Sequence, residues 1–314
     1  MTAPPLLVIA GATATGKTGL SIEVARVLRE EGIPAEIISA DSRQVYRGMD
    51  IGTAKVSAGE RGGVPHHGLD LVEPDEPFSV ADFVRHARPA LAAIAGRGGL
   101  AILAGGTGLY LRAIARGLDA DALPADPATR AEIEAEIVAD GLPAVAARLA
   151  AVAPMLAAGI DRNNPRRVAR TLEIATLRGD GPLPEAVGYA GPVSWVGLGL
   201  DPVTHLRWIS TRARAQFDAG LIDEARVLRE RFDPGLPAFS AIGYREAWAV
   251  IDGRLNLEAA IAEDARRNVA FVKRQRTWFK AEPGIEWLDA ADTDAAAARA
   301  LRVARDLASS SPGT

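Results

Sequence analysis

Residues 6–18 read LLVIAGATATGKT, a short apolar run that leads directly into a glycine-rich loop. Residues 11–18 match the pattern GxxxxGK(S/T) at every position. The apolar run before the loop is typical of a strand buried on both faces of a sheet. After the loop, apolar residues recur at helical spacing until Gly32. This order of strand, loop and helix is the context in which the pattern binds phosphate.

The loop carries the groups that phosphate binding needs. Gly11 and Gly16 let backbone N–H groups converge on phosphate oxygens, and the N-terminal end of the following helix adds positive potential. Lys17 supplies a point charge, and the Thr18 hydroxyl can join the ligand shell of Mg²⁺. We therefore expect Mg²⁺ as cofactor. The expected phosphate contacts are Gly11, Ala12, Thr13, Ala14, Thr15, Gly16, Lys17 and Thr18.

Strands and helices alternate along most of the chain. Buried strands are expected at residues 35–39, 100–104 and 193–200, and helices at 77–97, 202–231 and 257–280. The alternation predicts an α/β fold with a parallel sheet flanked by helices, as in P-loop NTPases.

One central region departs from this alternation. Residues 119–190 are rich in alanine and arginine, contain several prolines and show no pattern of a buried strand. They are interpreted as amphipathic helices. We therefore expect an α-helical insertion domain at 119–190, and a catalytic core made of residues 1–118 and 191–314.

Composition excludes several classes of protein. The 314 residues contain no cysteine, which excludes disulfides, thiolate zinc sites and cysteine nucleophiles. The adjacent His66 and His67 are interpreted as structural, because no third metal ligand accompanies them.

No apolar run reaches the roughly 18 residues that a membrane helix needs, and the start lacks a charged leader region. We expect a cytoplasmic protein with no membrane partner, and a monomer, since no segment resembles an obligate interface.

Positive charge is concentrated in two segments although the net charge is −4. Residues 162–178 hold five arginines and one acid, and residues 264–280 hold six cations and one acid. Local fields, rather than the total charge, attract a polyanion. From the pattern alone, 264–280 could be either an ordinary amphipathic helix with a solvated face or a surface that contacts RNA phosphates.

Asp41 directly follows the strand expected at 35–39 and begins a polar turn. A nucleoside triphosphatase normally has an apolar strand that ends in Asp and helps to hold the metal. The strand at 100–104 ends instead in Gly105, Gly106 and Thr107. Asp41 therefore has two open interpretations, a residue that holds the metal or a catalytic carboxylate.

Five motifs, in order along the chain, resemble those of the tRNA dimethylallyltransferase family. The most specific is DSRQVYRGMDIGTAK at residues 41–55. The others are GGTGLYLRAI (105–114), NPRRVARTLE (164–173), AIGYREAW (241–248) and KRQRTWF (273–279). The resemblance covers nearly the whole chain, with departures from the family pattern at Ala12, Thr15, Val56 and Trp208.

The resemblance implies an enzyme that transfers the dimethylallyl group of dimethylallyl diphosphate to the exocyclic amine of an adenosine on the 3′ side of the anticodon. The base would be flipped out of the tRNA anticodon stem-loop. Asp41 would accept the amine proton, which typically contributes about 10²–10⁴-fold in rate. Lys17, Thr18 with Mg²⁺ and the loop amides would stabilise the leaving diphosphate. Thr107 and Arg212 match family residues that orient the acceptor or contact the diphosphate.

The resemblance also implies which residues contact tRNA. Gln44 is expected to read the flipped base, because a Gln amide can make two hydrogen bonds to adenine. From the pattern alone, Tyr244 would instead be a core residue. The full expected set is Asp41, Ser42, Arg43, Gln44, Lys55, Thr107, Arg166, Arg167, Gly243, Tyr244, Arg245, Lys273, Arg274 and Gln275.

Two other functions stay open as alternatives. A small-molecule kinase of the P-loop class would transfer a phosphoryl group from ATP and would need no RNA. A non-catalytic RNA-binding protein would use the loop only to sense a nucleotide. Transfer of a labelled prenyl group to RNA, followed together with ATP consumption, distinguishes all three.

Overall fold

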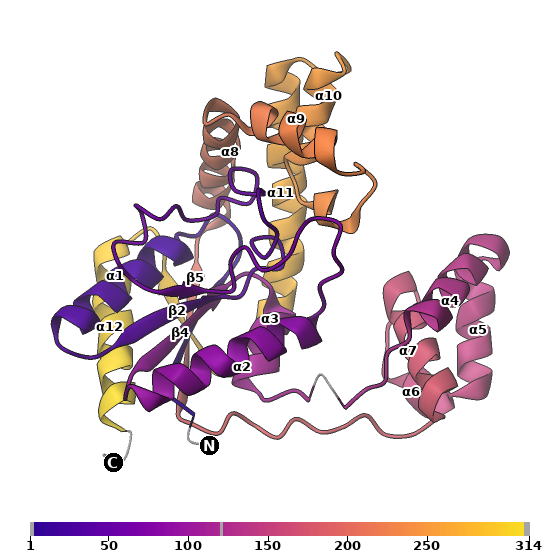
Figure 1. Cartoon of the computed structure of the whole chain (residues 1–314), viewed down its shortest axis with the longest axis horizontal. Helices are drawn as coiled ribbons and strands as arrows, with labels where there is room; N and C mark the ends of the chain where they lie inside the picture. The colour runs from indigo at the N-terminus through magenta and orange to yellow at the C-terminus, as the bar shows by residue number, and fades with distance from the viewer. Residues whose placement is uncertain (1–2, 120–121, 311–314) are drawn as a thin grey trace. The chain divides into compact units, whose positions relative to one another are not determined.

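A parallel sheet of six strands forms the centre of the fold. The computed structural model describes residues 3–119 and 122–310. The strands are β1 (Leu6–Gly11), β2 (Ala35–Ser39), β3 (His66–His67), β4 (Leu100–Gly105), β5 (Val193–Gly199) and β6 (Ile285–Asp289). Their order is β3-β2-β4-β1-β5-β6, and all neighbouring strands are parallel (Figure 1). The predicted parallel sheet is confirmed.

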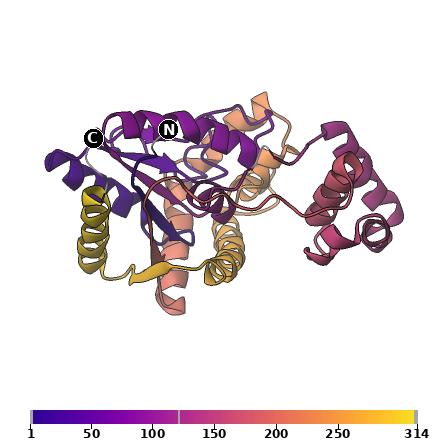
Figure 2. The same ribbon diagram turned by 90° about the horizontal axis from the view of Figure 1, so that it is seen from below.

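Helices cover both faces of this sheet. The helices α1 (Lys17–Glu30) and α12 (Thr293–Ser309) pack together on one face, and α2 (Val80–Gly96) and α3 (Gly108–Ala115) lie on the other (Figure 2). Every residue of β1 and β4 is buried. The continuous apolar runs form central strands because both faces are covered.

Further helices form a second apolar core in the same part of the chain. They are α8 (Pro202–Asp218), α9 (Leu221–Arg231), the 3-10 helix η1 (Pro237–Ser240), α10 (Tyr244–Ile251) and α11 (Leu257–Lys280). Their apolar faces pack around the segment that follows β2, including Val45 and Met49. The single helix predicted at 202–231 is wrong: Gly220 has a φ of 102°, a left-handed conformation that ends one helix and allows the next to begin.

The helical region in the middle of the chain is a compact unit by itself. The chain divides into 1–117 with 188–314 as one unit, and 118–187 as the other. The smaller unit contains α4 (Pro127–Asp140), α5 (Leu142–Val152), α6 (Pro154–Ala158) and α7 (Pro165–Arg178). Each begins with a proline in its first turn, where the missing N–H costs no hydrogen bond. Val145, Leu149, Val168 and Leu172 are central to its core.

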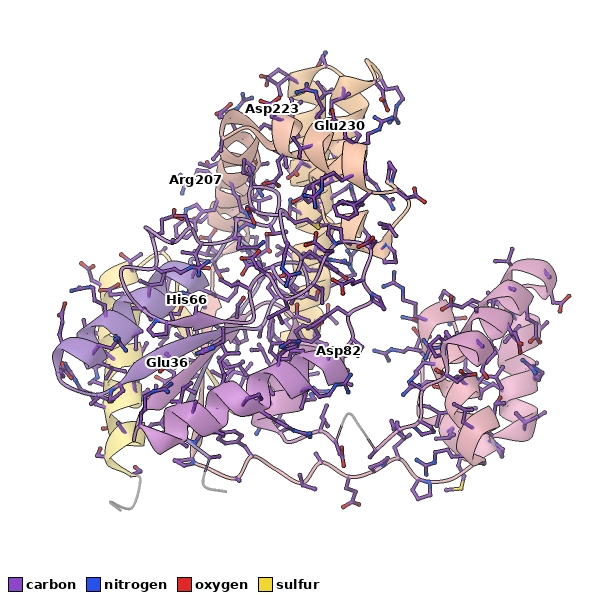
Figure 3. All side chains as sticks on the ribbon, viewed as in Figure 1. Glu36, His66, Asp82, Arg207, Asp223 and Glu230 are labelled. Atoms are coloured by element: carbon purple, nitrogen blue, oxygen red, sulfur yellow. The ribbon has the colours of Figure 1, made fainter. Side chains whose placement is uncertain are left out.

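Some elements differ from the predictions. The strands β3 and β6 and the helix α12 were not expected; β3 has only two residues and β6 is a partly exposed edge strand. The helix expected from residue 77 begins at Val80, because Ser79 and Asp82 form a capping box, with Asp82 at the start of α2 (Figure 3). Within residues 3–119 and 122–310, each helix is too short or too polar to cross a bilayer.

The two adjacent histidines have contacts that fit a structural role. They form β3 beside β2, and His67 Nε2 lies 2.7 Å from Glu36 Oε2. Figure 3 shows the labelled Glu36 and His66 in this region of the sheet. Arg97 binds the other oxygen of Glu36 at 2.5 Å. The Glu36 carboxylate therefore links His67 in β3 to Arg97, the residue that follows α2.

Candidate functional site

The phosphate loop connects the C-terminal end of β1 to α1. Ala14 and Gly16 have left-handed φ values of 57° and 83°, the kind of backbone that directs successive N–H groups into one concavity. A Cβ on Gly11 would lie 2.8 Å from Leu198 O, so a larger residue would push the loop away from β5. The helix α1 begins at Lys17 and directs its positive end toward the loop. This local geometry suits an anion.

Lys17 bends back over the loop. Its Nζ donates to Ala12 O at 2.6 Å. Burial and the nearby guanidinium of Arg212 lower the pKa of Lys17 to about 8, and the Asp41 carboxylate partly offsets them. Lys17, Arg212 and Asp41 are therefore close enough to influence one another's ionisation.

Asp41 lies at the C-terminal end of β2, where Thr107 holds the turn. Arg43 N donates to Asp41 Oδ1 at 2.8 Å, which fixes one carboxylate oxygen. Ser42 N donates to Thr107 Oγ1 at 3.0 Å, and Thr107 N donates to Ala40 O at 3.2 Å. Thr107 therefore contacts the residue on each side of Asp41.

The strand order brings Asp41 and the phosphate loop to the same edge of the sheet. Since β4 lies between β1 and β2, its C-terminal Gly105 and Gly106 lie between the loop and Asp41. A Cβ on Gly105 would be 2.1 Å from Ala40 O, so only glycine allows this approach. The carboxyl ends of parallel strands are the usual place for a ligand in such sheets.

A cavity of about 950 Å³ joins these groups. Its polar lining includes Thr13, Lys17, Thr18, Asp41, Gln44 and Arg212, and its apolar lining includes Ile22, Ile51, Ala54, Val56, Ala215 and Ala219. A site of this size and mixed lining accommodates a small ligand with one charged and one apolar end. The loop and Asp41 thus face one space.

Arg212 reaches this cavity from α8. Its Nη2 donates weakly to Thr53 O at 3.4 Å, and burial lowers its pKa while Asp41 and Asp264 raise it. Among the described residues, its buried Nε has no hydrogen-bond partner. Arg212 lines the same cavity as Lys17, and two cations in one cavity suit an anionic ligand.

The amide of Gln44 is used within the protein. Its Oε1 accepts from Ser39 Oγ at 2.9 Å, and its Nε2 lies 3.3 Å from both Thr53 O and Ala54 O. The expectation that this amide pairs with adenine conflicts with these bonds, since each side of the amide already has a partner. Gln44 still lines the cavity.

Lys55 is also a structural residue. Its side chain is only 3% exposed, and Nζ binds Asp50 Oδ1 and Asp70 Oδ1 at 2.6 Å and Tyr46 O at 2.7 Å. All three ammonium protons are therefore occupied. The expected contact of Lys55 with RNA is not compatible with this burial.

Tyr244 is fully buried, so the structure leaves no side-chain surface for the expected RNA contact. Its hydroxyl donates to Glu224 Oε1 at 2.8 Å, and the ring packs against Phe239 and Trp248. The preceding Gly243 is buried as well, whereas Arg245 is exposed. The pattern-based interpretation of Tyr244 as a core residue agrees with its position.

Replacing Tyr244 by Phe tests this core role. We expect the variant to lose about 1–3 kcal/mol of unfolding free energy, because a buried hydrogen bond to a charged group is removed. RNA affinity should stay at the wild-type value. Urea unfolding and an RNA titration measure the two effects, and weaker RNA binding with unchanged stability would contradict the assignment.

The cations expected to bind RNA are mostly exposed. Lys273 and Arg274 lie on the solvent side of α11, and Arg166 and Arg167 on that of α7 in the smaller unit. Arg43 differs, since its guanidinium binds Pro237 O at 2.9 Å and Ser240 Oγ at 2.8 Å. Gln275 also points inward, and its contacts are given below.

Two further polar residues shape the cavity and were missed from the sequence. Glu224 accepts hydrogen bonds from the N–H groups of Asp50, Ile51 and Gly52 at 2.7–3.0 Å. Gln216 Nε2 donates to Ile51 O and Gly52 O at 2.7 and 2.9 Å. Together they fix the loop that forms one cavity wall. A detectable signal was the polar Gln216 on the face of α8 that also carries Ile209, Ala213 and Phe217.

The chain offers few protein ligands for a metal. Within the described residues, no group of three or more His, Asp or Glu side chains is placed to hold an ion. Thr18 is exposed and lines the same cavity as Asp41. A hydroxyl and a carboxylate fit Mg²⁺ that is held largely by phosphate oxygens and water.

Known proteins match this chain over most of its length. A sequence model of the family described as IPP transferase matches residues 44–282. A tRNA dimethylallyltransferase of Anaeromyxobacter sp. (strain K) is 47% identical, over 94% of this chain and 97% of the relative. The crystal structure of a tRNA isopentenylpyrophosphate transferase from Bacillus halodurans has a TM-score of 0.70 at 38% identity, covering 97% of this chain and 96% of that one.

A third comparison concerns a eukaryotic protein. Its structure, described as a dimethylallyltransferase acting on tRNA, has a TM-score of 0.80 at 25% identity and covers 99% of this chain and 81% of that one. The family model spans more than half of the chain, and the bacterial relative matches it almost from end to end. The chain therefore belongs to the tRNA dimethylallyltransferase family, also called the IPP transferases.

Proposed function

We propose that this protein transfers a dimethylallyl group from dimethylallyl diphosphate to the exocyclic amine of the adenosine on the 3′ side of a tRNA anticodon. A bond forms between that nitrogen and the first prenyl carbon while the bond from this carbon to the diphosphate oxygen breaks. The amine proton passes to the Asp41 carboxylate, and diphosphate leaves. The observation that carries the proposal is the single cavity that Asp41 shares with the phosphate loop.

The phosphate side of the cavity fits the leaving group. Backbone N–H groups bind phosphate whatever organic group is attached, so the loop suits a prenyl diphosphate as well as a nucleotide. Lys17 and Arg212 would stabilise the charge that grows as the bond to oxygen breaks. Mg²⁺, with Thr18 as a ligand, would neutralise part of that charge. The apolar wall formed by Ile22, Val56 and their neighbours suits the prenyl group.

The acceptor side depends on Asp41. An aromatic amine is a weak nucleophile, so a carboxylate that accepts its proton as the new bond forms accelerates attack. Thr107 would act by holding the turn that carries Asp41, through Ser42 N and Ala40 O. The base must leave its stack to reach this cavity.

The RNA backbone would be bound by exposed cations. On α11 these include Lys273 and Arg274, and on α7 Arg166 and Arg167, each within its own unit. Such contacts release counterions, so RNA affinity should fall as salt rises despite the net charge of −4. We also propose that the protein acts in the cytoplasm and as a monomer.

The activity test uses labelled dimethylallyl diphosphate and an anticodon stem-loop, with labelled ATP in a parallel reaction. We expect the prenyl label to appear on RNA and no phosphoryl transfer from ATP. Phosphoryl transfer from ATP in the absence of RNA would favour the kinase alternative. The family comparison does not favour that alternative. The absence of both reactions would favour a non-catalytic RNA-binding protein.

The lowered pKa of Lys17 predicts a pH dependence of diphosphate affinity. Below about pH 8 Lys17 is protonated and binds the anion; above it, affinity should fall by up to about tenfold per pH unit. Binding above this pH should take up a proton, because the anion favours the charged amine. Calorimetry with inorganic diphosphate in two buffers of different ionisation enthalpy measures this uptake.

Lys17→Arg is the matched control, because arginine stays protonated throughout this range. The ligand's own ionisation is common to both proteins and cancels in the comparison. The wild-type protein should lose affinity more steeply than the variant as pH rises. Equal slopes would show that Lys17 does not titrate in this range.

A further inference from the structure

Buried side chains bind both the backbone N–H and the carbonyl oxygen of Thr13 in the phosphate loop. Its N–H donates to Gln275 Oε1 at 2.9 Å. Its carbonyl oxygen lies 2.7 Å from His205 Nε2. The Gln275 and His205 side chains are buried, at 7% and 2% exposed. They come from α11 and α8, far from the loop in sequence.

The hydrogen-bond partners fix the tautomer of His205. A carbonyl oxygen can only accept, so Nε2 carries the proton. Nδ1 then accepts from Arg276 Nη2 at 2.9 Å, and the same Arg276 nitrogen donates to Leu200 O at 2.6 Å. Burial lowers the pKa of His205, in agreement with this neutral ring. Arg276 thus fixes the ring that holds Thr13.

The amide of Gln275 joins two loops of the site. While its Oε1 accepts from Thr13, its Nε2 donates to Gly106 O at 3.0 Å. The opposite amide orientation would place donor against donor and acceptor against acceptor. A Cβ on Gly106 would lie 2.5 Å from this Nε2, so a larger residue there would displace the Gln275 amide. One side chain therefore links the phosphate loop to the turn beside Asp41.

We propose that Gln275 and His205, the latter fixed by Arg276, are positioning residues that hold the phosphate loop ready for diphosphate. They touch Thr13 and not the ligand. A loop already held in its binding conformation avoids the ordering cost of binding, which raises affinity. The inference rests on the proposed function for the identity of the ligand. It replaces the expected role of Gln275 as an RNA contact.

The first test compares two residues of α11 that lie two positions apart. Gln275→Met keeps the side-chain volume and removes both hydrogen bonds, while Lys273→Gln removes an exposed charge. Inorganic diphosphate and the RNA stem-loop are titrated separately into each full-length variant. Gln275→Met should weaken diphosphate binding by roughly tenfold or more and leave RNA affinity near wild type. Lys273→Gln should show the opposite pattern.

A pair of His205 variants keeps the proposal testable if Gln275→Met folds poorly. His205→Gln can still donate to Thr13 O, whereas His205→Phe fills a similar space and cannot. Diphosphate affinity should be close to wild type in the first and about tenfold weaker in the second. Thermal unfolding of both variants checks that their stabilities are comparable.

Two outcomes would overturn the proposal: unchanged diphosphate affinity with weaker RNA binding in Gln275→Met, or equal diphosphate affinity in the two His205 variants. The diphosphate titrations need no prenyl donor and no transfer activity. If the predicted pattern appeared in a protein that transferred no prenyl group, the proposed function would fail while the role of these residues would stand.

Discussion

Asp41→Asn is expected to lower kcat by about 10²–10⁴-fold while RNA affinity stays near wild type. Asparagine keeps the size of the side chain and the oxygen that accepts from Arg43 N, so the turn should be retained. It cannot accept the amine proton under these conditions. The loss should therefore appear in the chemical step and not in substrate binding.

Single-turnover transfer at saturating RNA and diphosphate measures this step. Glu23→Gln is a matched control, because Glu23 is an exposed carboxylate at the same cavity and loses the same charge. Its rate should be close to wild type. A near-normal rate for Asp41→Asn, or an equal loss in the control, would remove Asp41 from the role of proton acceptor.

Lys17→Ala is expected to reduce kcat/KM for the prenyl diphosphate by about 10²–10³-fold. The ammonium lies in a partly buried cavity, where a charge interacts more strongly than in water. Arg212 would remain, but it approaches from α8 and not from the loop. RNA affinity should be unaffected, since Lys17 lies over the loop and donates to Ala12 O.

Separate titrations of diphosphate and RNA check that Lys17 acts on one substrate. Lys273→Gln is the comparison, because this exposed residue of α11 belongs to the proposed RNA surface. It should weaken RNA binding and leave diphosphate binding unchanged. Similar losses for both ligands in Lys17→Ala would indicate a general disturbance of the fold.

The strands of the sheet were predicted well where their sequences are continuously apolar. The run AEIIS forms β2 with the predicted bounds, and the runs at β1 and β4 extend by one residue. The two-residue β3 and the edge strand β6 have no such pattern, because pairing with a neighbour defines them more than burial. Local sequence cannot show such a partner.

The sequence predicted which motifs form the site and which strands they follow. The phosphate loop and Asp41 each follow a buried strand, and in a parallel sheet strand ends meet at one edge. Which side chain of a motif faces the cavity could not be predicted. Gln44, Lys55, Tyr244 and Gln275 were assigned to RNA, yet each is committed to partners within the protein.

The directions of these side chains could not be predicted because their hydrogen-bond partners are distant in the sequence. Tyr244 is held by Glu224, which also binds the backbone at Ile51, 173 positions away in the sequence. Gln275 binds Thr13 across 262 positions. A short motif specifies residue types and spacing, but the direction of each side chain is set by the elements packed against it.

The most direct measurement is a nucleoside analysis of the RNA product from two stem-loops that differ at one base. One carries adenosine on the 3′ side of the anticodon, and the other carries inosine, whose exocyclic oxygen replaces the amine. With labelled dimethylallyl diphosphate, we predict label only on the adenosine RNA, attached to the exocyclic nitrogen. Equal labelling of both RNAs, or no labelling of either by the folded protein, would contradict the account.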